Sequence, residues 1–319
     1  MAGRRATGGG PQFDAAVAPG GYVWWYVDAL SDDGRHGLSI ISFVGSVFSP
    51  YYKFARRKAN ADPENHVAIN VALYGAGGHR WTMTERGRRE LSRTANAFAV
   101  GPSSLRWDGD GLTFDIDEMT VPIPSRLKGR VRVIPSALNE QSFLLDAKGE
   151  HTWRPIAPVS RVEVAFENGL KWSGNGYFDW NSGVVPLEDS FRRWDWSRAS
   201  DAHGATIFYD VTLKDGSDEG LSLFIRPDGI IEQLEAPSLC KLARAPIWRV
   251  ERGTRSDDGK GGAVVKTLED TPFYARSIVS SRVAGRPVTA MHESLSLDRF
   301  VSPVVQLMLP FRMPRRAGR

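Results

Sequence analysis

Acidic and aromatic side chains gather in one short segment, residues 172–198, with the sequence WSGNGYFDWNSGVVPLEDSFRRWDWSR. Tyr177 lies two positions before Asp179, and Asp195 stands between two tryptophans. The tryptophans of the segment are Trp172, Trp180, Trp194 and Trp196. Aromatic surroundings exclude water, which favours the protonated form of a carboxylic acid, and aromatic faces stabilise a cation. The segment therefore predicts acid chemistry in an apolar pocket.

Asp179 is the candidate acid because its chain neighbours are Phe178 and Trp180. Loss of water around a carboxyl group raises its pKa, and a protonated carboxylic acid can then donate its proton near neutral pH. Tyr177 would share a face with Asp179 in a strand and would orient the acid or hold a water molecule. The alternative is structural, because the sequence DWNSG is rich in turn formers and Asp179 would then cap backbone groups.

Asp195 is the competing candidate acid of the segment. It lies within FRRWDWSR, beside Arg192, Arg193 and Arg198. An aspartate among arginines is expected to be ionised and paired, so we predict a structural role for Asp195.

The composition favours an all-β protein. The chain of 319 residues has 32 glycines and 19 prolines, and its alternating segments are short. We expect a hairpin from residues 20–30 and 38–48, a second from residues 66–74 and 79–85, and a final strand at residues 304–311. Residues 86–96 are expected to form about two turns of helix. Spacing of this kind suits barrels or sandwiches with few short helices.

Two successive runs of strands predict two β domains. We place a disordered leader at residues 1–19, an N-terminal domain with the acid motif at 20–190 and a C-terminal domain at 191–319. Residues 1–19 are rich in Gly, Ala and Pro, so ordered structure is expected to begin at Gly20.

Several classes of function are disfavoured. The chain has one cysteine, its six histidines show no metal-ligand spacing, and no nucleotide-binding motif or nucleic-acid-binding module is recognisable. We therefore expect no metal and no cofactor. No apolar stretch approaches the length of a transmembrane helix and no secretory signal follows Arg4 and Arg5, which predicts a cytoplasmic protein. The basic tail at residues 312–319 is expected to be solvated, or alternatively attracted weakly to an anionic membrane.

Four motifs together resemble the bacterial carotenoid 1,2-hydratases, also called hydroxyneurosporene synthases. They are GYFDWN at residues 176–181, FRRWDWSRA at 191–199, FYARS at 273–277, and HESLSLDRFVSPVVQLMLPFRMPRR at 292–316. The likeness extends over most of the chain from Gly20 onward.

The resemblance implies a lipocalin-like fold and a hydro-lyase without a cofactor. Such an enzyme adds water to the terminal C1–C2 double bond of an acyclic carotene such as neurosporene or lycopene. Within the family, a His-x-Trp pair and a Tyr-x-Asp pair are associated with catalysis, and the matching positions are His151 with Trp153 and Tyr177 with Asp179.

The chemistry gives each of these residues a role. Asp179 would protonate C2, Trp153 would face the resulting tertiary cation, and His151 would accept a proton from the attacking water. Without the resemblance, His151 would be a structural histidine and the tryptophans would be core residues. The expected substrate-binding residues are Trp180, Trp172, Phe178 and Tyr274, with Arg276 and Glu293 as further candidates for the pocket wall.

Two other functions stay open. A terpenoid cyclase would use the same first protonation but exclude water from the cation. A lipocalin-like carrier of carotenoids or lipids would need apolar walls and no buried acid. For each, the partner is a long apolar molecule, which makes peripheral membrane contact an expectation, while no oligomeric state is predicted.

Overall fold

The computed structural model describes residues 10–58, 61–75 and 78–316. It divides into two compact units. Unit 1 comprises Met1–Leu144, His151–Val184 and Phe311–Arg319, and unit 2 comprises Leu145–Glu150 and Val185–Pro310. The domain boundary after residue 190 stays a prediction, and residues 1–9 of the expected leader lie outside the described residues.

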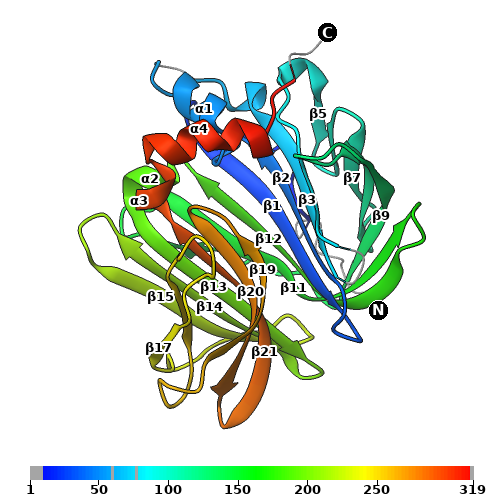
Figure 1. Ribbon diagram of the computed structural model, residues 1–319. Helices are drawn as coiled ribbons and strands as arrows, with labels where there is room; N and C mark the ends of the chain where they lie inside the picture. The colour runs from blue at the N-terminus through cyan, green and yellow to red at the C-terminus, as the bar shows by residue number, and fades with distance from the viewer. Residues whose placement is uncertain (1–9, 59–60, 76–77, 317–319) are drawn as a thin grey trace, which may run out of the picture. The chain divides into compact units, whose positions relative to one another are not determined.

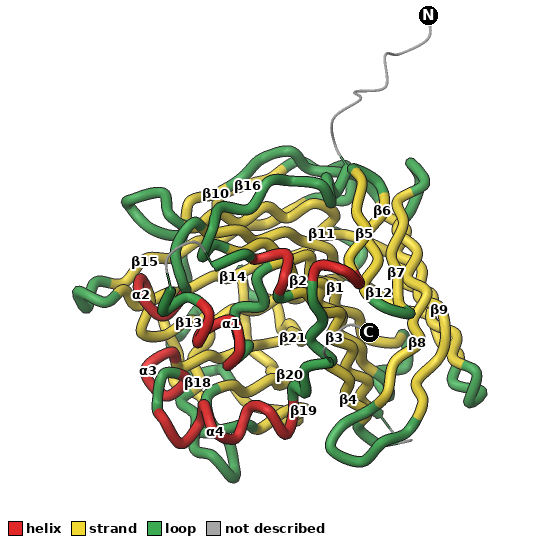
Figure 2. The backbone as a smooth tube through the Cα atoms, turned by 90° about the horizontal axis from the view of Figure 1, so that it is seen from above, coloured by secondary structure: helices red, strands yellow, loops and turns green. Residues whose placement is uncertain are grey.

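Unit 1 is built around one curled antiparallel sheet in the order β4-β3-β2-β1-β12-β11-β9-β8-β7-β6-β5, with β10 paired to β11. Its strands are β1 (Tyr22–Ser31), β2 (Gly37–Val44), β3 (Val67–Tyr74), β4 (Arg80–Met83), β5 (Leu91–Thr94), β6 (Ala97–Val100), β7 (Ser103–Trp107), β8 (Leu112–Met119), β9 (Arg126–Pro135), β10 (Phe143–Leu144), β11 (His151–Phe166) and β12 (Lys171–Gly183). Figure 1 shows β1, β12 and β11 side by side, and Figure 2 shows β5, β6 and β7 as neighbours.

Alternation of side chains along β1 gives the sheet of unit 1 two different faces. Val23, Trp25, Val27 and Ala29 belong to a large apolar core, together with alternate residues of β2 and β3. The intervening residues of β1 are aromatic or acidic and point to the opposite face, since successive side chains of a strand alternate. The predicted hairpins β1–β2 and β3–β4 are both confirmed.

Unit 2 contains a second antiparallel sheet, in the order β16-β15-β14-β13-β21-β20-β19, and a separate hairpin of β17 and β18. Its strands are β13 (Phe191–Asp201), β14 (Gly204–Leu213), β15 (Asp218–Ile225), β16 (Ile231–Gln233), β17 (Leu239–Leu242), β18 (Arg252–Arg255), β19 (Ala263–Asp270), β20 (Tyr274–Val283) and β21 (Arg286–Ser296). The hairpin is tied to the sheet by polar bonds. Arg252 donates to Ser277 Oγ at 2.8 Å, and the Gly253 amide donates to Asp195 Oδ1 at 3.2 Å.

Helices are few and short. They are α1 (Pro50–Ala55), α2 (Leu187–Ser190), α3 (Leu297–Phe300) and α4 (Pro303–Arg312), with 3-10 turns η1 (Pro63–Asn65) and η2 (Arg88–Glu90). The prediction of an all-β fold with two antiparallel β units is confirmed.

Two local predictions were wrong. Residues 86–96 form η2 and β5 instead of two turns of helix, because this segment pairs with β6 as an edge of the sheet. Residues 304–311 form helix α4 instead of a strand. Their apolar residues recur at helical spacing, and Pro303 lies in the first helical turn, where the missing amide costs no hydrogen bond.

Ordered structure begins earlier than Gly20. Phe13 is fully buried, its ring centroid lies 5.0 Å from that of Trp25, and its amide donates to the Ala95 carbonyl. The Gly- and Pro-rich composition of the leader pointed to disorder, and this single aromatic anchor in the core outweighs it.

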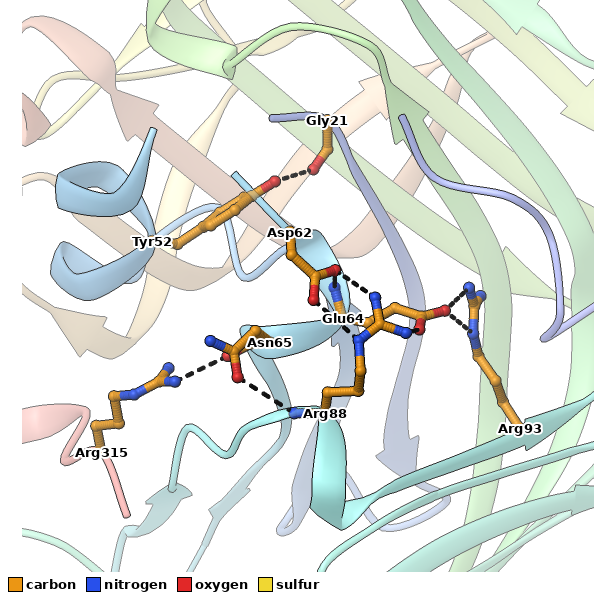
Figure 3. Close-up of polar contacts among 8 residues, drawn as sticks. All are labelled: Gly21, Tyr52, Asp62, Glu64, Asn65, Arg88, Arg93 and Arg315. Atoms are coloured by element: carbon orange, nitrogen blue, oxygen red, sulfur yellow. Dashed lines mark hydrogen bonds and ion pairs between the residues drawn. The ribbon is translucent and has the colours of Figure 1, made fainter. Parts of the chain in front are cut away.

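A network of ion pairs fixes the turns beside the start of β1 (Figure 3). Arg88 donates to Asp62 Oδ1 at 2.6 Å and also pairs with Glu64, which in turn accepts from Arg93 Nε at 3.0 Å. In the same region, the Tyr52 hydroxyl donates to the Gly21 carbonyl at 2.6 Å. The network therefore links η1, η2 and β5 around the chain entry into β1.

Candidate active site

Three adjacent strands of unit 1 carry the candidate catalytic residues on one face. Asp179 of β12 is paired in register with Tyr26 of β1, and Tyr177 is paired with Asp28. Directly paired residues of antiparallel strands share a face, with Cβ atoms about 4.5–5.5 Å apart. This face of the sheet is opposite to the face that packs into the apolar core of unit 1. The candidate catalytic side chains therefore lie apart from the core side chains that stabilise the sheet.

The third strand, β11, contributes the His-x-Trp pair to this same face. His151 is paired in register with Gly183, and Trp153 with Asn181, both of β12. His151 and Trp153 are fully buried, as is Tyr177, and Asp179 is 3% exposed. The four predicted catalytic residues thus belong to one face of two neighbouring strands.

Three side chains donate hydrogen bonds to the Asp179 carboxyl group. Trp153 Nε1 donates to Oδ2 at 2.8 Å, and the Tyr177 hydroxyl donates to the same oxygen at 2.7 Å. Asn181 Nδ2 lies 3.3 Å from Oδ1. Donors of this kind stabilise the carboxylate, whereas burial stabilises the neutral acid. The arrangement lets Asp179 give up a proton inside the protein without leaving an unsupported negative charge.

Tyr177 is held in its neutral form, so its hydroxyl is a hydrogen-bond donor at neutral pH. Burial first, and then the nearby Asp179 carboxyl, raises the pKa of Tyr177 well above its ordinary value. The Tyr26 ring meets the Tyr177 ring edge-on, with centroids 6.2 Å apart. A neutral tyrosine in a fixed orientation can hold Asp179 in one position.

His151 is positioned by Tyr22 of β1. The Tyr22 hydroxyl lies 2.8 Å from His151 Nδ1, and the two rings stack with centroids 5.9 Å apart. Tyr22 in turn stacks on Trp24, with centroids 4.9 Å apart. A Cβ atom at Gly183 would lie 2.5 Å from Tyr22 Cε1 and 2.6 Å from His151 Nδ1. Glycine at position 183 therefore makes room for the contact between tyrosine and histidine.

Several residues of this face were missed by the sequence analysis. Tyr22, Trp24, Tyr26 and Asp28 occupy alternate positions of β1, and Asn181 bonds to Asp179. Asp28 is fully buried and lowers the tendency of Tyr177 to ionise. A signal was present, since a carboxylate in the aromatic strand YVWWYVDAL is unusual, and period-two alternation places it with the aromatic residues.

The predicted substrate-binding residues are not brought together with the catalytic face. Phe178 belongs to the apolar core, and Trp172 and Trp180 pack against that core. All three lie on the side of β12 that faces away from Asp179. The Arg154 guanidinium lies 5.6 Å from the Trp180 ring centroid. Burial of Asp179 was attributed from the sequence to its chain neighbours Phe178 and Trp180, which in fact face away from it. Trp153 and Tyr177 contact Asp179 instead.

The remaining candidates belong to unit 2. Tyr274 is half-buried on β20, with the Arg276 guanidinium 5.5 Å from its ring centroid, and Arg276 pairs with Glu293 at 2.6 Å. Asp195 pairs with Arg193 at 2.8 Å, which confirms the expected arginine partner. It also accepts a hydrogen bond from Ser294. Substrate binding by Tyr274, Trp172, Phe178 and Trp180 stays a prediction.

Among residues 10–58, 61–75 and 78–316, no group of three or more His, Cys, Asp or Glu side chains is placed to hold a metal ion. The site combines a buried carboxyl group with aromatic neighbours. Such a group can protonate an alkene, and the aromatic faces can stabilise the cation that results.

Comparison with known proteins shows the family of the chain. Residues 40–319 match the family model described as "Carotenoid hydratase CrtC". The chain belongs to the carotenoid hydratase family. A family relative from Thiocapsa roseopersicina named acyclic carotenoid 1,2-hydratase is 58% identical over 310 residues, which cover 97% of this chain and 76% of the relative. A protein of the same name from Rubrivivax gelatinosus is 52% identical over 97% of this chain and 77% of its own length.

A shorter carotenoid hydratase aligns over nearly its whole length. The acyclic carotenoid 1,2-hydratase of Cereibacter sphaeroides is 42% identical over 280 residues, which cover 88% of this chain and 99% of the relative. The family resemblance of the four sequence motifs is thereby confirmed.

Solved structures of low sequence identity share the fold. An AttH candidate from Nitrosomonas europaea aligns over 91% of this chain and 98% of its own, with a TM-score of 0.59 and 14% identity. Kievitone hydratase from Nectria haematococca aligns over 92% of this chain and 94% of its own, with a TM-score of 0.55 and 8% identity. These likenesses show the lipocalin-like fold alone.

Proposed function

We propose that this chain is an acyclic carotenoid 1,2-hydratase, a hydro-lyase that adds water to the terminal C1–C2 double bond of an acyclic carotene. The observation that carries the proposal is the 58% identity to a protein of that name over 97% of the chain. The buried acid at Asp179 supports it, because hydration of an unactivated alkene begins with a proton. Neurosporene, lycopene and their relatives are the proposed substrates.

In the first step, Asp179 transfers a proton to C2 and the positive charge develops on C1, which becomes a tertiary cation. Oδ2 of Asp179 accepts two short hydrogen bonds, from Trp153 and Tyr177, whereas Oδ1 accepts a longer one from Asn181, so Oδ1 is the proposed source of the proton. As the carboxylate forms, both donors stabilise its charge. Both hydrogen bonds become stronger as negative charge develops on the carboxyl group, and this difference between ground state and transition state raises the rate.

In the second step, water attacks C1 and loses a proton. We assign His151 to receive it, since the imidazole can accept a proton near neutral pH. Return of that proton to Asp179 closes the cycle, so the sum of the steps is carotene plus water. The Tyr22 hydroxyl lies 2.8 Å from His151 Nδ1, and we propose Tyr22 as the residue that positions the His151 ring.

The aromatic side chains of the same face are proposed to stabilise the cation. Trp24 and Tyr26 of β1 share a face with Asp179 and are buried. Trp153 has its indole nitrogen committed to Asp179, and its ring packs against Phe143 with centroids 5.5 Å apart. An aromatic face contributes roughly 0.5–2 kcal/mol to a nearby cation.

A long hydrocarbon substrate partitions into lipid, so we also propose peripheral contact of the protein with a membrane. No helix in the described part of the chain has the length and apolar character needed to cross a bilayer. Cytoplasmic location stays a prediction.

Product analysis tests the proposed activity. Purified protein is incubated with lycopene in detergent, without added cofactor or metal and with a chelator present, and the products are analysed by mass. Gain of one water molecule is the expected result. An isomer of unchanged mass but altered retention would instead indicate cyclisation, and unchanged lycopene that co-elutes with the protein would indicate a carrier.

A further inference from the structure

Helix α4 exposes an apolar stripe. Val304, Leu307, Met308 and Phe311 recur at the spacing i, i+3, i+4 and i+7, which places them on one side of a helix. Leu307 is 75% exposed and Phe311 is 77% exposed. Contact between a continuous apolar surface and water is unfavourable in free energy, and such exposed surfaces mark interaction sites.

The opposite side of α4 is packed, so the stripe does not result from a helix that hangs free. Val305 and Leu309 are each 7% exposed, and the Gln306 amide donates to the Phe300 carbonyl at 2.6 Å. Figures 1 and 2 show α4 as a continuous helix. Helix α4 therefore has apolar residues on two sides, one packed against the protein and one exposed.

The chain after α4 is also fixed, in unit 1. The Arg312 guanidinium lies 4.8 Å from the centroid of the Trp81 ring, and Arg315 pairs with Glu85. The Pro314 carbonyl accepts from the Glu85 amide at 3.0 Å, and Arg315 donates to the Asn65 carbonyl at 2.9 Å (Figure 3). These contacts hold the residues that follow Phe311 in place, and so they help to fix the exposed position of Phe311.

The charged residues of the sequence after Asp298 are all positive, and one of them, Arg315, is paired with Glu85. No Asp or Glu follows Asp298 in the sequence, whereas Arg299, Arg312, Arg315, Arg316 and Arg319 do. Asp298 itself forms an ion pair with Lys214, with 2.8 Å between Oδ1 and Nζ. Arg312 and Arg316 are exposed. An apolar stripe beside arginines is complementary to a bilayer surface, where acyl chains receive the apolar side chains and anionic head groups attract the arginines.

A loop of unit 2 also exposes apolar side chains, and the Asp270 carboxylate fixes it by accepting from the amides of Ile247 and Trp248. Ile247 is 76% exposed and Trp248 is 39% exposed. Arg299 of α3, the helix before α4, donates to the Trp248 carbonyl at 2.5 Å. Tryptophan is enriched where proteins meet the boundary between lipid and water, so this loop adds an anchor of the expected type.

We propose that α4 is a membrane-docking helix, with the stripe of Val304, Leu307, Met308 and Phe311 inserted into the outer layer of a bilayer that contains anionic lipid. The proposal deepens the proposed function in that the carotene substrate is dissolved in the same lipid. Docking through this stripe requires neither a transmembrane segment nor a protein partner. Binding is reversible and weakens as ionic strength rises, because the arginines contribute through screened charge.

Vesicle sedimentation tests the proposal without substrate. Full-length protein is mixed with vesicles of phosphatidylcholine alone or with phosphatidylglycerol added, and the bound fraction is measured at low and high salt. We expect binding to the anionic vesicles, and a decrease of about 10-fold or more in the partition coefficient when Leu307→Ser and Phe311→Ser are combined. Both side chains are exposed, so the variant is expected to fold, and its melting temperature checks this.

A matched control separates a specific surface from general hydrophobicity. Ile123 is 80% exposed and Leu144 is 62% exposed, and neither belongs to α4. The combined variant Ile123→Ser and Leu144→Ser should bind anionic vesicles like the wild type. The proposal is overturned if the wild type does not bind, if both double variants bind alike, or if the wild type is a dimer that the α4 variant converts to a monomer.

The two proposals fail separately. Hydration of lycopene in detergent micelles requires no docking to a bilayer, so loss of the activity there contradicts the hydratase and leaves vesicle binding to be judged on its own. With lycopene in vesicles, the α4 variant should lose turnover while it keeps the turnover of the wild type in micelles.

Discussion

The indole nitrogen of Trp153 donates a hydrogen bond of 2.8 Å to Oδ2 of Asp179 on the adjacent strand. The pair joins two motifs of this sequence, the His-x-Trp of β11 and the Tyr-x-Asp of β12, through a hydrogen bond. Trp153 was expected to face the cation, and this contact gives it a second role, which is to hold the acid and stabilise the carboxylate after proton transfer.

The variant Trp153→Phe distinguishes these two roles. Phenylalanine keeps an aromatic face but removes the N–H donor, so kcat/KM should fall by about 10–100-fold, the worth of one hydrogen bond to a charged group. Turnover of lycopene in micelles by variant and wild type is the measurement. Activity close to that of the wild type would mean that the hydrogen bond is dispensable and that only the aromatic face matters.

Tyr177 and Trp153 donate to the same oxygen, so their effects should be coupled. Tyr177→Phe alone should lower kcat by roughly 10–100-fold, because it too removes one donor to the carboxylate. Residues in one hydrogen-bonded network are not additive. A double variant whose loss equals the product of the two single losses would contradict a shared role at Oδ2.

Gly183→Ala should displace the His151 side chain without changing any group that takes part in the reaction. The new methyl group would overlap the rings of Tyr22 and His151, which are buried and have little room to move. We expect a loss of stability of about 1–3 kcal/mol and a decrease in kcat, measured by denaturant unfolding and turnover. Ser182→Ala is the control, since Ser182 is half-buried and its side chain points to the other face of β12.

Unit 2 should lose stability in mild acid because of His292. This side chain is fully buried, burial lowers its pKa below the ordinary value of 6.5, and Asp195, Arg252, Glu293 and the Gly253 carbonyl are its charged and polar neighbours. A lowered pKa means that the unfolded chain binds the proton first as pH falls. Stability should therefore be unaffected above pH 6.5 and decline below it, by at most about 1.4 kcal/mol per pH unit.

Thermal unfolding of the wild type and of His292→Gln across this range checks the prediction. Glutamine does not titrate, and its amide can still donate to the Gly253 carbonyl, which His292 Nε2 contacts at 2.6 Å. The variant should show a flatter dependence on pH between neutral and mildly acidic conditions. Parallel curves for the two proteins would assign the acid sensitivity to other groups.

Much of the fold followed from local pattern. The hairpins β1–β2 and β3–β4 were predicted because alternation and turn residues are both local signals. The helix α4 was missed because a short apolar run was assigned to a strand without weighing its helical spacing or the Pro303 at its start. Burial of Phe13 depends on partners such as Phe98, far away in the chain, which composition does not reveal.

The site was predictable where a motif carried it. Tyr177 and Asp179 could be placed on one face from their spacing alone, whereas the pairing of β12 with β1, and with it the place of Asp28 and Tyr26, is a property of the sheet topology. The assignment of Phe178 and Trp180 to the pocket overlooked the alternation of a strand. Residues adjacent to a functional side chain in a strand point away from it.

The most direct test of the account is proton transfer by Asp179. Wild type, Asp179→Asn and Asp179→Glu are incubated with lycopene in D₂O, and the product is analysed by mass for deuterium bound to carbon. The account predicts one deuterium at C2 with wild type, a loss of at least about 100-fold in turnover for Asp179→Asn, and partial recovery with Asp179→Glu, which restores the acid. Turnover by Asp179→Asn close to that of the wild type would show that another group protonates the carotene, and the account would be wrong.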